Sequence, residues 1–168
     1  DAWLARERVL FEGPRLVAAA AAVAEPGACV PVDIPGTSAI LVRGGDGVLR
    51  AFANACRHRA TRLVDAPCQA KAMVCPYHGW TYELTGALRH VPHSDAFPGV
   101  ARRDLVELPV AERHGLVWLR GEPQLGALDA DLAALALERH VAYRQVRVTR
   151  RCNWKLVIEA FLDGYHIR

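Results

Sequence analysis

The sequence predicts a mainly β domain of small antiparallel sheets that carries two loops with metal-ligand residues, followed by the start of an α+β domain. From residue 28 onward, short runs of β-forming residues alternate with Gly, Pro and Asp turn residues. Two clusters of Cys and His interrupt these runs, and helical spacing of apolar residues follows only after residue 125. With 168 residues and 52% apolar side chains, the chain can bury one compact core.

The first part of the chain contains an alanine-rich run over residues 16–24, between Pro14 and Pro26. Alanine favours helix, so we expect a short buried helix or apolar segment here. The run is too short to span a bilayer, and its flanks do not resemble a signal peptide. We expect three parts of the chain: an N-terminal segment over 1–27, the β domain over 28–124, and the start of a second domain over 125–168.

The β domain divides into strands at its turn residues. The run Gly44-Gly45-Asp46-Gly47 predicts a hairpin between two of these strands, and the stretch over residues 112–115 predicts another. The strands are expected over residues 28–34, 39–43, 48–53, 80–84, 105–111 and 116–120. Helical spacing then predicts a helix over residues 128–140 with its leucines buried (Leu128, Leu132, Leu135, Leu137), and alternation predicts a strand over 143–149.

Two short clusters contain metal-ligand side chains, Cys56-Arg57-His58 and Cys75-Pro76-Tyr77-His78. Each offers one thiolate and one imidazole, so two converging loops would supply two sulfur and two nitrogen ligands. A Rieske 2Fe-2S cluster has this arrangement, with two Cys on one iron and two His on the other. Zinc also takes two Cys and two His, but zinc fingers pair like ligands, whereas the two types alternate here. We therefore favour the iron-sulfur cluster over zinc.

The residues around both clusters resemble a known family. The stretches Asn54-Ala55-Cys56-Arg57-His58-Arg59 and Cys75-Pro76-Tyr77-His78-Gly79-Trp80-Thr81-Tyr82 are similar to the cluster loops in the oxygenase component, or alpha subunit, of Rieske non-haem iron ring-hydroxylating oxygenases. The stretch Asn153-Trp154-Lys155 to Asp163-Gly164-Tyr165-His166 resembles the opening of the catalytic domain of those subunits. The resemblance implies that this chain is the N-terminal portion of such a subunit.

The resemblance also implies roles for single residues. Cys56 and Cys75 would bind one cluster iron, and His58 and His78 the other. His166 would be the first ligand of a mononuclear Fe(II), whose remaining ligands would lie beyond residue 168. Asp163 and His166 are three residues apart, so on a helix they would share a face. In the family this Asp is a catalytic residue that bridges the iron His of its own subunit to a cluster His of the next, which would be His78.

The implied function is that of an enzyme, a Rieske dioxygenase or monooxygenase. It would accept electrons from an NAD(P)H-dependent reductase or a ferredoxin at the cluster and pass them to the mononuclear iron. There they would support O2-dependent hydroxylation of a small organic, aromatic substrate. The full-length protein would be a cytoplasmic homotrimer or alpha3beta3 assembly. The alternative is a standalone Rieske ferredoxin-type carrier, although such carriers are shorter and have no reason to contain the late helix.

Two positions depart from the family pattern: Ala60 stands where Gly is frequent and Ala160 where Asn is frequent. The first puts a tight turn in question, and the second removes a polar side chain near the future iron site. High-potential Rieske proteins have a Ser hydroxyl after the His-Gly pair, where this chain has Trp80. We therefore expect a low reduction potential, roughly −150 mV.

The charge pattern predicts neither nucleic-acid nor membrane binding, because the 21 basic residues are mixed with 18 acidic ones. Basic side chains around the two clusters are expected to attract an acidic electron donor (Arg57, Arg59, Arg62, Lys71). The other three cysteines, Cys29, Cys68 and Cys152, are expected to be reduced thiols.

Overall fold

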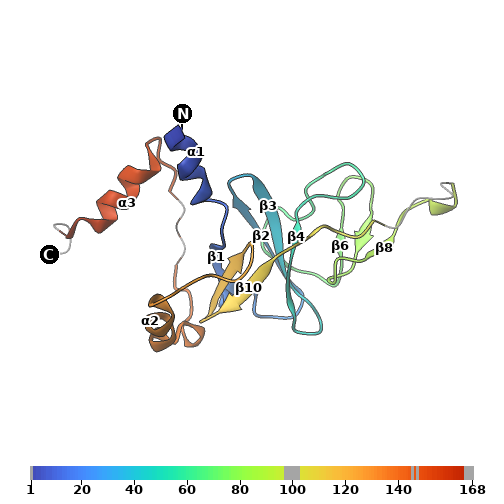
Figure 1. The fold of residues 1–168 in the computed structure, drawn as a ribbon. Coiled ribbons are helices and arrows are strands. Elements are labelled where there is room, and N and C mark those ends of the chain that lie inside the picture. The colour runs from blue at the N-terminus through green and yellow to red at the C-terminus, as the bar shows by residue number, and fades with distance from the viewer. Residues whose placement is uncertain (1, 97–102, 145, 147, 165–168) are drawn as a thin grey trace.

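The computed structural model describes residues 2–96, 103–144, 146 and 148–164. A β-rich body carries three α-helices on one side and the two cluster loops on the other (Figure 1). The elements are α1 (Ala2–Val9), β1 (Arg15–Ala19), η1 (Ala20–Val23), β2 (Ala28–Ile34), β3 (Thr37–Arg43), β4 (Leu49–Ala53), β5 (Cys68–Gln69), β6 (Met73–Val74), β7 (Thr81–Tyr82), β8 (Leu88–His90), η2 (Ser94–Ala96), β9 (Glu107–Leu108), β10 (Val110–Arg113), β11 (Leu116–Leu119), α2 (Leu128–Leu135), η3 (Leu137–Arg139) and α3 (Trp154–Leu162).

Three antiparallel sheets form the body in the described residues, in the orders β5-β2-β3-β4-β9, β1-β11-β10 and β6-β7-β8. The predicted mainly β fold of small antiparallel sheets is therefore confirmed. The strands β2, β3 and β4 lie within one or two residues of their predicted bounds, because their turn residues and apolar runs are local signals. The predicted hairpin at the Gly-rich turn also forms, with Arg43 opposite Leu49.

The central sheet is buried on both faces. Along β3, Ile40 and Val42 belong to one apolar core, whereas Ala39 and Leu41 belong to another. Successive side chains of a strand point to opposite faces, so this alternation places β3 between two layers. The β1-β11-β10 sheet covers the second core through residues such as Val117. The first core contains Cys56 and Cys75, the cysteines of the two cluster loops. Folding of the sheet and assembly of the site therefore depend on the same packing.

The alanine-rich run does not form the predicted helix. Residues 15–19 form β1, which pairs with β11, and a short 3-10 helix follows at Ala20–Val23. A run of this length gains little from helix propensity alone, because nucleation is costly. Hydrogen bonding to the edge of β11 satisfies its backbone instead. The alternative expectation, a buried apolar segment, holds in part, since Ala20 and Val23 are buried.

The region after residue 125 differs most from expectation. Helix α2 ends at Leu135 because Ala136 takes a left-handed φ of 46°. The predicted burial of Leu128 and Leu135 is wrong, since they are 60% and 55% exposed and no described element packs extensively over α2. The predicted strand over 143–149 is also wrong at its described positions, where Tyr143 is fully exposed; residues 145 and 147 lie outside the described residues.

Helix α3 begins as the sequence indicates. The Asn153 side chain accepts a hydrogen bond of 3.0 Å from the backbone N–H of Lys155, which caps the first turn. Helix α3 begins beside α1 (Figure 1). An ion pair of 2.6 Å joins Lys155 Nζ to Glu7 Oε1 of α1, and the Trp154 ring contacts the ring of Phe11, just after α1, edge to face. Across the described residues, no helix is both long and apolar enough for a membrane crossing.

The turn between β7 and β8 gives a test of core packing beneath the site. Gly86 has a φ of +87°, and a Cβ there would overlap the buried ring of Phe52. We expect Gly86→Ala to lower the free energy of unfolding by about 2–4 kcal/mol, from left-handed strain plus overpacking. Gly36, with a φ of +74° and open space around it, is the matched control, and Gly36→Ala should cost only about 1 kcal/mol. Equal losses in urea titrations of the two variants would contradict this account.

Candidate metal centre

Two short turns carry the predicted ligands, and they have the same hydrogen-bond pattern. In loop 1, residues 54–64, the N–H of Cys56 donates to the carbonyl of Thr61 and the N–H of Ala60 donates to the carbonyl of Cys56, both at 2.8 Å. In loop 2, residues 75–80, Cys75 donates to Trp80 at 2.8 Å and Gly79 donates to Cys75 at 3.0 Å. Each turn therefore anchors its cysteine backbone twice and projects the following histidine outward.

The fourth residue after each cysteine takes a left-handed backbone conformation. Gly79 has a φ of +70° and Ala60 a φ of +56°. The tight turn that Ala60 put in question is therefore formed without glycine. A left-handed Ala costs roughly 1 kcal/mol relative to Gly, which the packing of loop 1 must offset.

The sulfur and nitrogen sides of the site differ in burial. Cys56 and Cys75 are each 3% exposed and belong to the apolar core that includes Phe52 and Tyr82. His58 and His78 are exposed. The site therefore presents its thiols to the interior and its imidazoles to the surface.

The two imidazoles lie next to each other, each against an aromatic ring. The ring centroids of His58 and His78 are 4.8 Å apart. The Trp80 ring stacks on His58 at 5.1 Å with an interplanar angle of 7°, and the Tyr77 ring stacks on His78 at 3.8 Å. Partial desolvation, followed by the neighbouring His78 and Arg59, lowers the pKa of His58. A lower pKa favours the neutral imidazole that a metal requires.

The buried side chain of Asn54 holds loop 1 in place, a role that the sequence analysis missed. Its Oδ1 accepts hydrogen bonds from the N–H groups of Leu63 at 2.9 Å and Val64 at 3.1 Å, and its Nδ2 donates to the Val64 carbonyl at 2.7 Å. Asn54 is 4% exposed, so loss of these bonds would leave polar groups unsatisfied in the core. Its position directly after a β run and before Cys56 was the one available signal.

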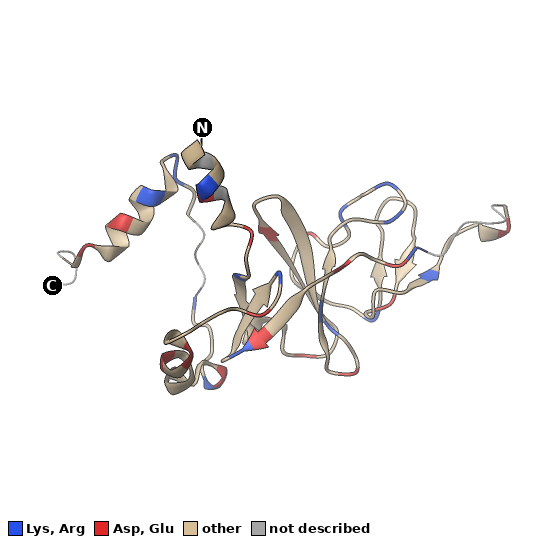
Figure 2. Ribbon diagram, in the orientation of Figure 1, with Lys and Arg blue, Asp and Glu red and all other residues tan. Residues whose placement is uncertain are grey.

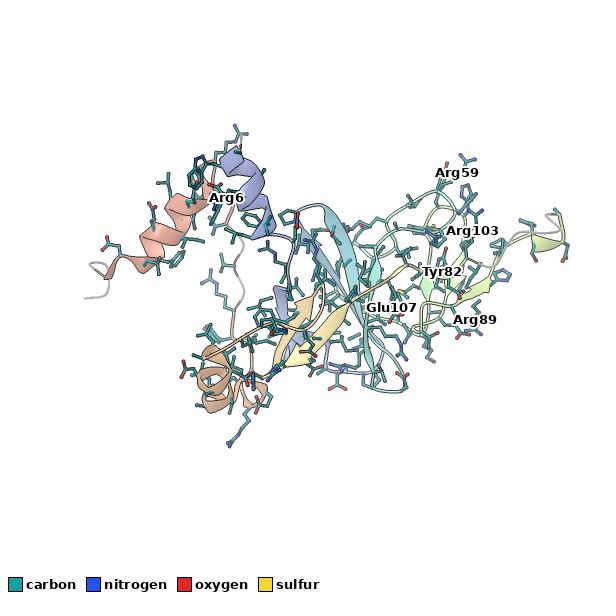
Figure 3. The ribbon with its side chains drawn as sticks, in the orientation of Figure 1. Arg6, Arg59, Tyr82, Arg89, Arg103 and Glu107 are labelled. Carbon is teal, nitrogen blue, oxygen red and sulfur yellow. The ribbon has the colours of Figure 1, made fainter. Side chains whose placement is uncertain are left out.

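Tyr82 joins the two loops and was also missed. Its hydroxyl accepts a hydrogen bond of 3.0 Å from the N–H of Arg57 and lies 3.3 Å from Cys56 Sγ (Figure 3 labels Tyr82). Burial, and then the contact with Cys56, raises the pKa of the Tyr82 phenol above its ordinary value. When Cys56 is a thiolate, the hydroxyl must be the donor in this contact.

This donor set fits a two-iron cluster. A tetrahedral zinc site needs four ligands around one ion, whereas a two-iron cluster takes its protein ligands in pairs, two on each iron. A buried pair of thiols beside an exposed pair of imidazoles matches the second case.

The comparisons with known proteins agree with this geometry. A protein-family model described as the Rieske [2Fe-2S] domain matches residues 14–112. The chain belongs to the Rieske family. The cluster that we favoured over zinc on sequence grounds is therefore confirmed as the cofactor of this domain, and the Rieske match begins just before β1.

The relatives of this Rieske chain are oxygenase subunits. It is 34% identical over 176 residues to the carnitine monooxygenase oxygenase subunit of Escherichia coli, which covers 96% of this chain and 46% of that protein. It is 34% identical over 143 residues to the chlorobenzene dioxygenase subunit alpha of a Cupriavidus species, covering 76% of this chain and 32% of that protein. The chain thus spans about half or less of these relatives. The predicted N-terminal portion of an alpha subunit is confirmed.

A solved structure agrees with the same assignment. The quaternary ammonium Rieske monooxygenase CntA in complex with its substrate L-carnitine superposes with a TM-score of 0.77 at 28% identity, covering 96% of this chain and 49% of that one. The similarity therefore continues past the end of the Rieske match at residue 112 and includes the region of α2 and α3.

Asp163, predicted to contact the mononuclear-iron ligand, is not brought to the cluster loops within this chain. Helix α3 ends at Leu162, and Asp163 follows in an extended conformation, so Asp163 is not on the predicted helix face. Within one chain, α3 and the cluster loops lie at opposite ends (Figure 1). His166 lies outside the described residues. The bridge from Asp163 to His78 of another subunit stays a prediction.

Several Lys and Arg positions lie along the backbone at the end of the molecule that carries the cluster loops (Figure 2). Arg57, Arg59 and Lys71 are exposed there. Arg62 behaves differently from the other predicted basic residues, because it forms an ion pair with Asp33 at 2.9 Å and contacts Asp65 at 3.2 Å. We therefore assign Arg62 to the packing of loop 1 rather than to a docking surface.

The hydroxyl of Tyr82 affects the predicted low reduction potential. It lies 3.3 Å from Cys56 Sγ, so it can donate to a ligand sulfur even though Trp80 replaces the Ser hydroxyl of high-potential Rieske proteins. We expect Tyr82→Phe to lower the reduction potential on the order of 40 mV, since one hydrogen bond of about 1 kcal/mol would no longer stabilise the reduced state. Tyr77→Phe keeps the ring that stacks on His78 and is the matched control. A redox titration in which both variants keep the parent potential would show that the Tyr82 contact does not tune the cluster.

Proposed function

We propose that this chain is the cluster-bearing, N-terminal portion of the oxygenase component of a Rieske non-haem iron oxygenase. The observation that carries the proposal is the pairing of two matched turns that bury both thiols and expose both imidazoles. A standalone Rieske carrier would share those turns. The similarity to oxygenase subunits, however, extends over 96% of the chain and includes the region after residue 112, which a carrier does not require.

In this proposal, Cys56 and Cys75 bind the inner iron and His58 and His78 bind the outer iron. The cluster, when bound, would supply one-electron transfer between a donor protein and a mononuclear iron. The protein's own contribution is to orient the ligands: the Tyr82 hydroxyl lies 3.3 Å from Cys56 Sγ and would donate to its thiolate, and Trp80 packs on the His58 ring. Exposure of the imidazoles places the outer end of the site where another protein or subunit can approach it.

The mononuclear iron would be bound by the longer protein, with His166 as its first ligand. Asp163 would accept a hydrogen bond from His166 and from His78 of a neighbouring subunit. A carboxylate held between two metal-bound imidazoles orients both rings and couples the charges of the two sites. The separation of α3 from the cluster loops within one chain supports an arrangement between subunits, as in a head-to-tail trimer (Figure 1).

The substrate proposed from the relatives is a quaternary ammonium compound of the carnitine type, and the reaction is a monooxygenation. The support is the extent of similarity: the carnitine monooxygenase subunit matches 96% of this chain, whereas the chlorobenzene dioxygenase subunit matches 76% at the same identity of 34%. The aromatic substrate expected from the sequence is the second candidate, and the dioxygenase relative supports it. The proposed electron donor is an NAD(P)H-dependent reductase or a ferredoxin with an acidic surface that fits the basic side chains around the imidazoles.

Metal analysis tests the ligand assignment directly. The purified chain should contain about two iron atoms and two acid-labile sulfides and should be coloured. Its reduced form should give the paramagnetic signal of mixed nitrogen and thiolate coordination. Cys75→Ser should lose iron and sulfide together, whereas Cys152→Ser, at an exposed cysteine remote from the loops in sequence, should keep both. A colourless preparation that contains zinc would refute the assignment.

The substrate class can be separated by isotope labelling of the full-length protein. The full-length protein is supplied with its reductase, NADH and labelled O2. We expect a carnitine-type substrate to acquire one labelled oxygen atom and to increase NADH consumption. Chlorobenzene should do neither. Incorporation of both oxygen atoms into the aromatic compound would instead establish the second candidate. Release of peroxide alone with every quaternary ammonium compound tested would count against the first.

A further inference from the structure

Two cysteines outside the cluster face each other across a pair of strands. The short strand β5 pairs with the start of β2, and Cys68 lies directly opposite Cys29 in the antiparallel register. The pairing continues into the next residues, where the N–H of Ala70 donates to the carbonyl of Gly27 at 2.9 Å. This position of Cys68 is therefore set by the backbone and does not depend on a side-chain rotamer.

The two thiols differ sharply in exposure. Cys29 is 0% exposed, and its thiol lies 3.6 Å from the Gly27 carbonyl, whereas Cys68 is exposed. Burial, and then the adjacent Cys68, raises the pKa of Cys29 to about 11. Cys68 is thus the thiol that a solvent-borne oxidant can reach, while Cys29 stays protonated behind it.

Their register suits a covalent bond. Residues directly opposite in an antiparallel pair have Cα atoms about 4.5–5.5 Å apart. A disulfide spans Cα separations of about 4.4–6.8 Å. The backbones of β2 and β5 therefore need no shift for the two cysteines to be joined. Rotation of the side chains is enough to bring the sulfur atoms together.

We propose that Cys29 and Cys68 are a redox modification site, which forms a reversible disulfide when the chain meets hydrogen peroxide. In the first step, the Cys68 thiolate attacks a peroxide oxygen, the O–O bond breaks and hydroxide leaves, which gives a sulfenic acid. In the second step, the Cys29 sulfur attacks the Cys68 sulfur, the S–S bond forms, the S–O bond breaks and water leaves. The two thiols lose two electrons and two protons in total, and peroxide is reduced to two molecules of water.

The location of the pair connects it to the cluster site. Cys68 lies on the segment that joins loop 1 to loop 2, and Cys29 lies in the central sheet, within the apolar core that contains Cys56 and Cys75. The disulfide would therefore fasten the connection between the two loops to the sheet that supports them. The closed segment includes β3, β4 and all of loop 1. A crosslink around so long a segment restricts the unfolded chain and stabilises the folded one.

The test is peptide mapping of the intact chain after brief peroxide treatment and alkylation. We expect a crosslinked pair of peptides containing Cys29 and Cys68, its recovery as free thiols with dithiothreitol, and a rise in the thermal midpoint of roughly 5–10 °C. Cys152→Ser removes another exposed thiol and should leave both results unchanged. Cys68→Ser should abolish the crosslink and the thermal shift, with Cys29 remaining reduced.

Three outcomes would overturn the proposal: oxidation of Cys68 to a sulfinic acid with Cys29 still free, a bond from Cys68 to Cys152, or a crosslink confined to Cys56 and Cys75. The peptide map and thermal midpoint require neither turnover nor a bound cluster. Iron and sulfide content, measured on the same samples, reports separately on the function proposed above. Failure of one assignment is therefore distinguishable from failure of the other.

Discussion

The structure depends on the burial of two cysteine sulfurs at the ends of loops that are otherwise exposed. Cys56 and Cys75 belong to the same apolar core as Ile40 and Phe52 of the central sheet, and their backbones are fixed by matching turn hydrogen bonds. Packing of the sheet therefore places both thiols in one core. A rigid scaffold beneath functional loops is a general solution, because loops alone cannot hold ligands within the tolerance that a metal site needs.

The asymmetry of the site follows from the same packing. Thiols in the core are shielded from solvent, whereas the imidazoles stand at the surface against Tyr77 and Trp80. In the proposed function, an electron would therefore enter or leave through the histidine side without any opening of the core. The Tyr82 hydroxyl lies on the buried side, next to Cys56. The hydroxyl that we expect to tune the potential is thus separate from the imidazoles that we propose face a partner.

Those parts of the structure that depend on local sequence signals were predictable. The bounds of β2, β3 and β4 lie in short patterns that carry their own turn signal. The four proposed cluster ligands stand in short patterns with their own spacing signal, and the structure places all four in two matching turns. The roles of Asn54 and Tyr82 were not predictable in the same way, because each contacts residues distant in the sequence. That part of the alanine-rich run forms β1 was not predictable for the same reason, because its pairing partner β11 is distant in the sequence.

In the region after residue 125, local sequence signals predict a helix but not what packs against it. Helix α3 has nine residues, a length that is marginal for an isolated helix, and Leu156, Phe161 and Leu162 are 57%, 84% and 78% exposed. The Lys155 ion pair with Glu7 and the Trp154 ring contact with Phe11 both lie at the first turn of α3, so they orient its start beside the N-terminal residues. The cluster loops are assembled by packing within the described chain. The proposed bridge from Asp163, in contrast, ends on His78 of a neighbouring subunit. The two halves of the proposed electron path thus differ in what organises them: the interior of one domain for the first, and surfaces that meet between chains for the second.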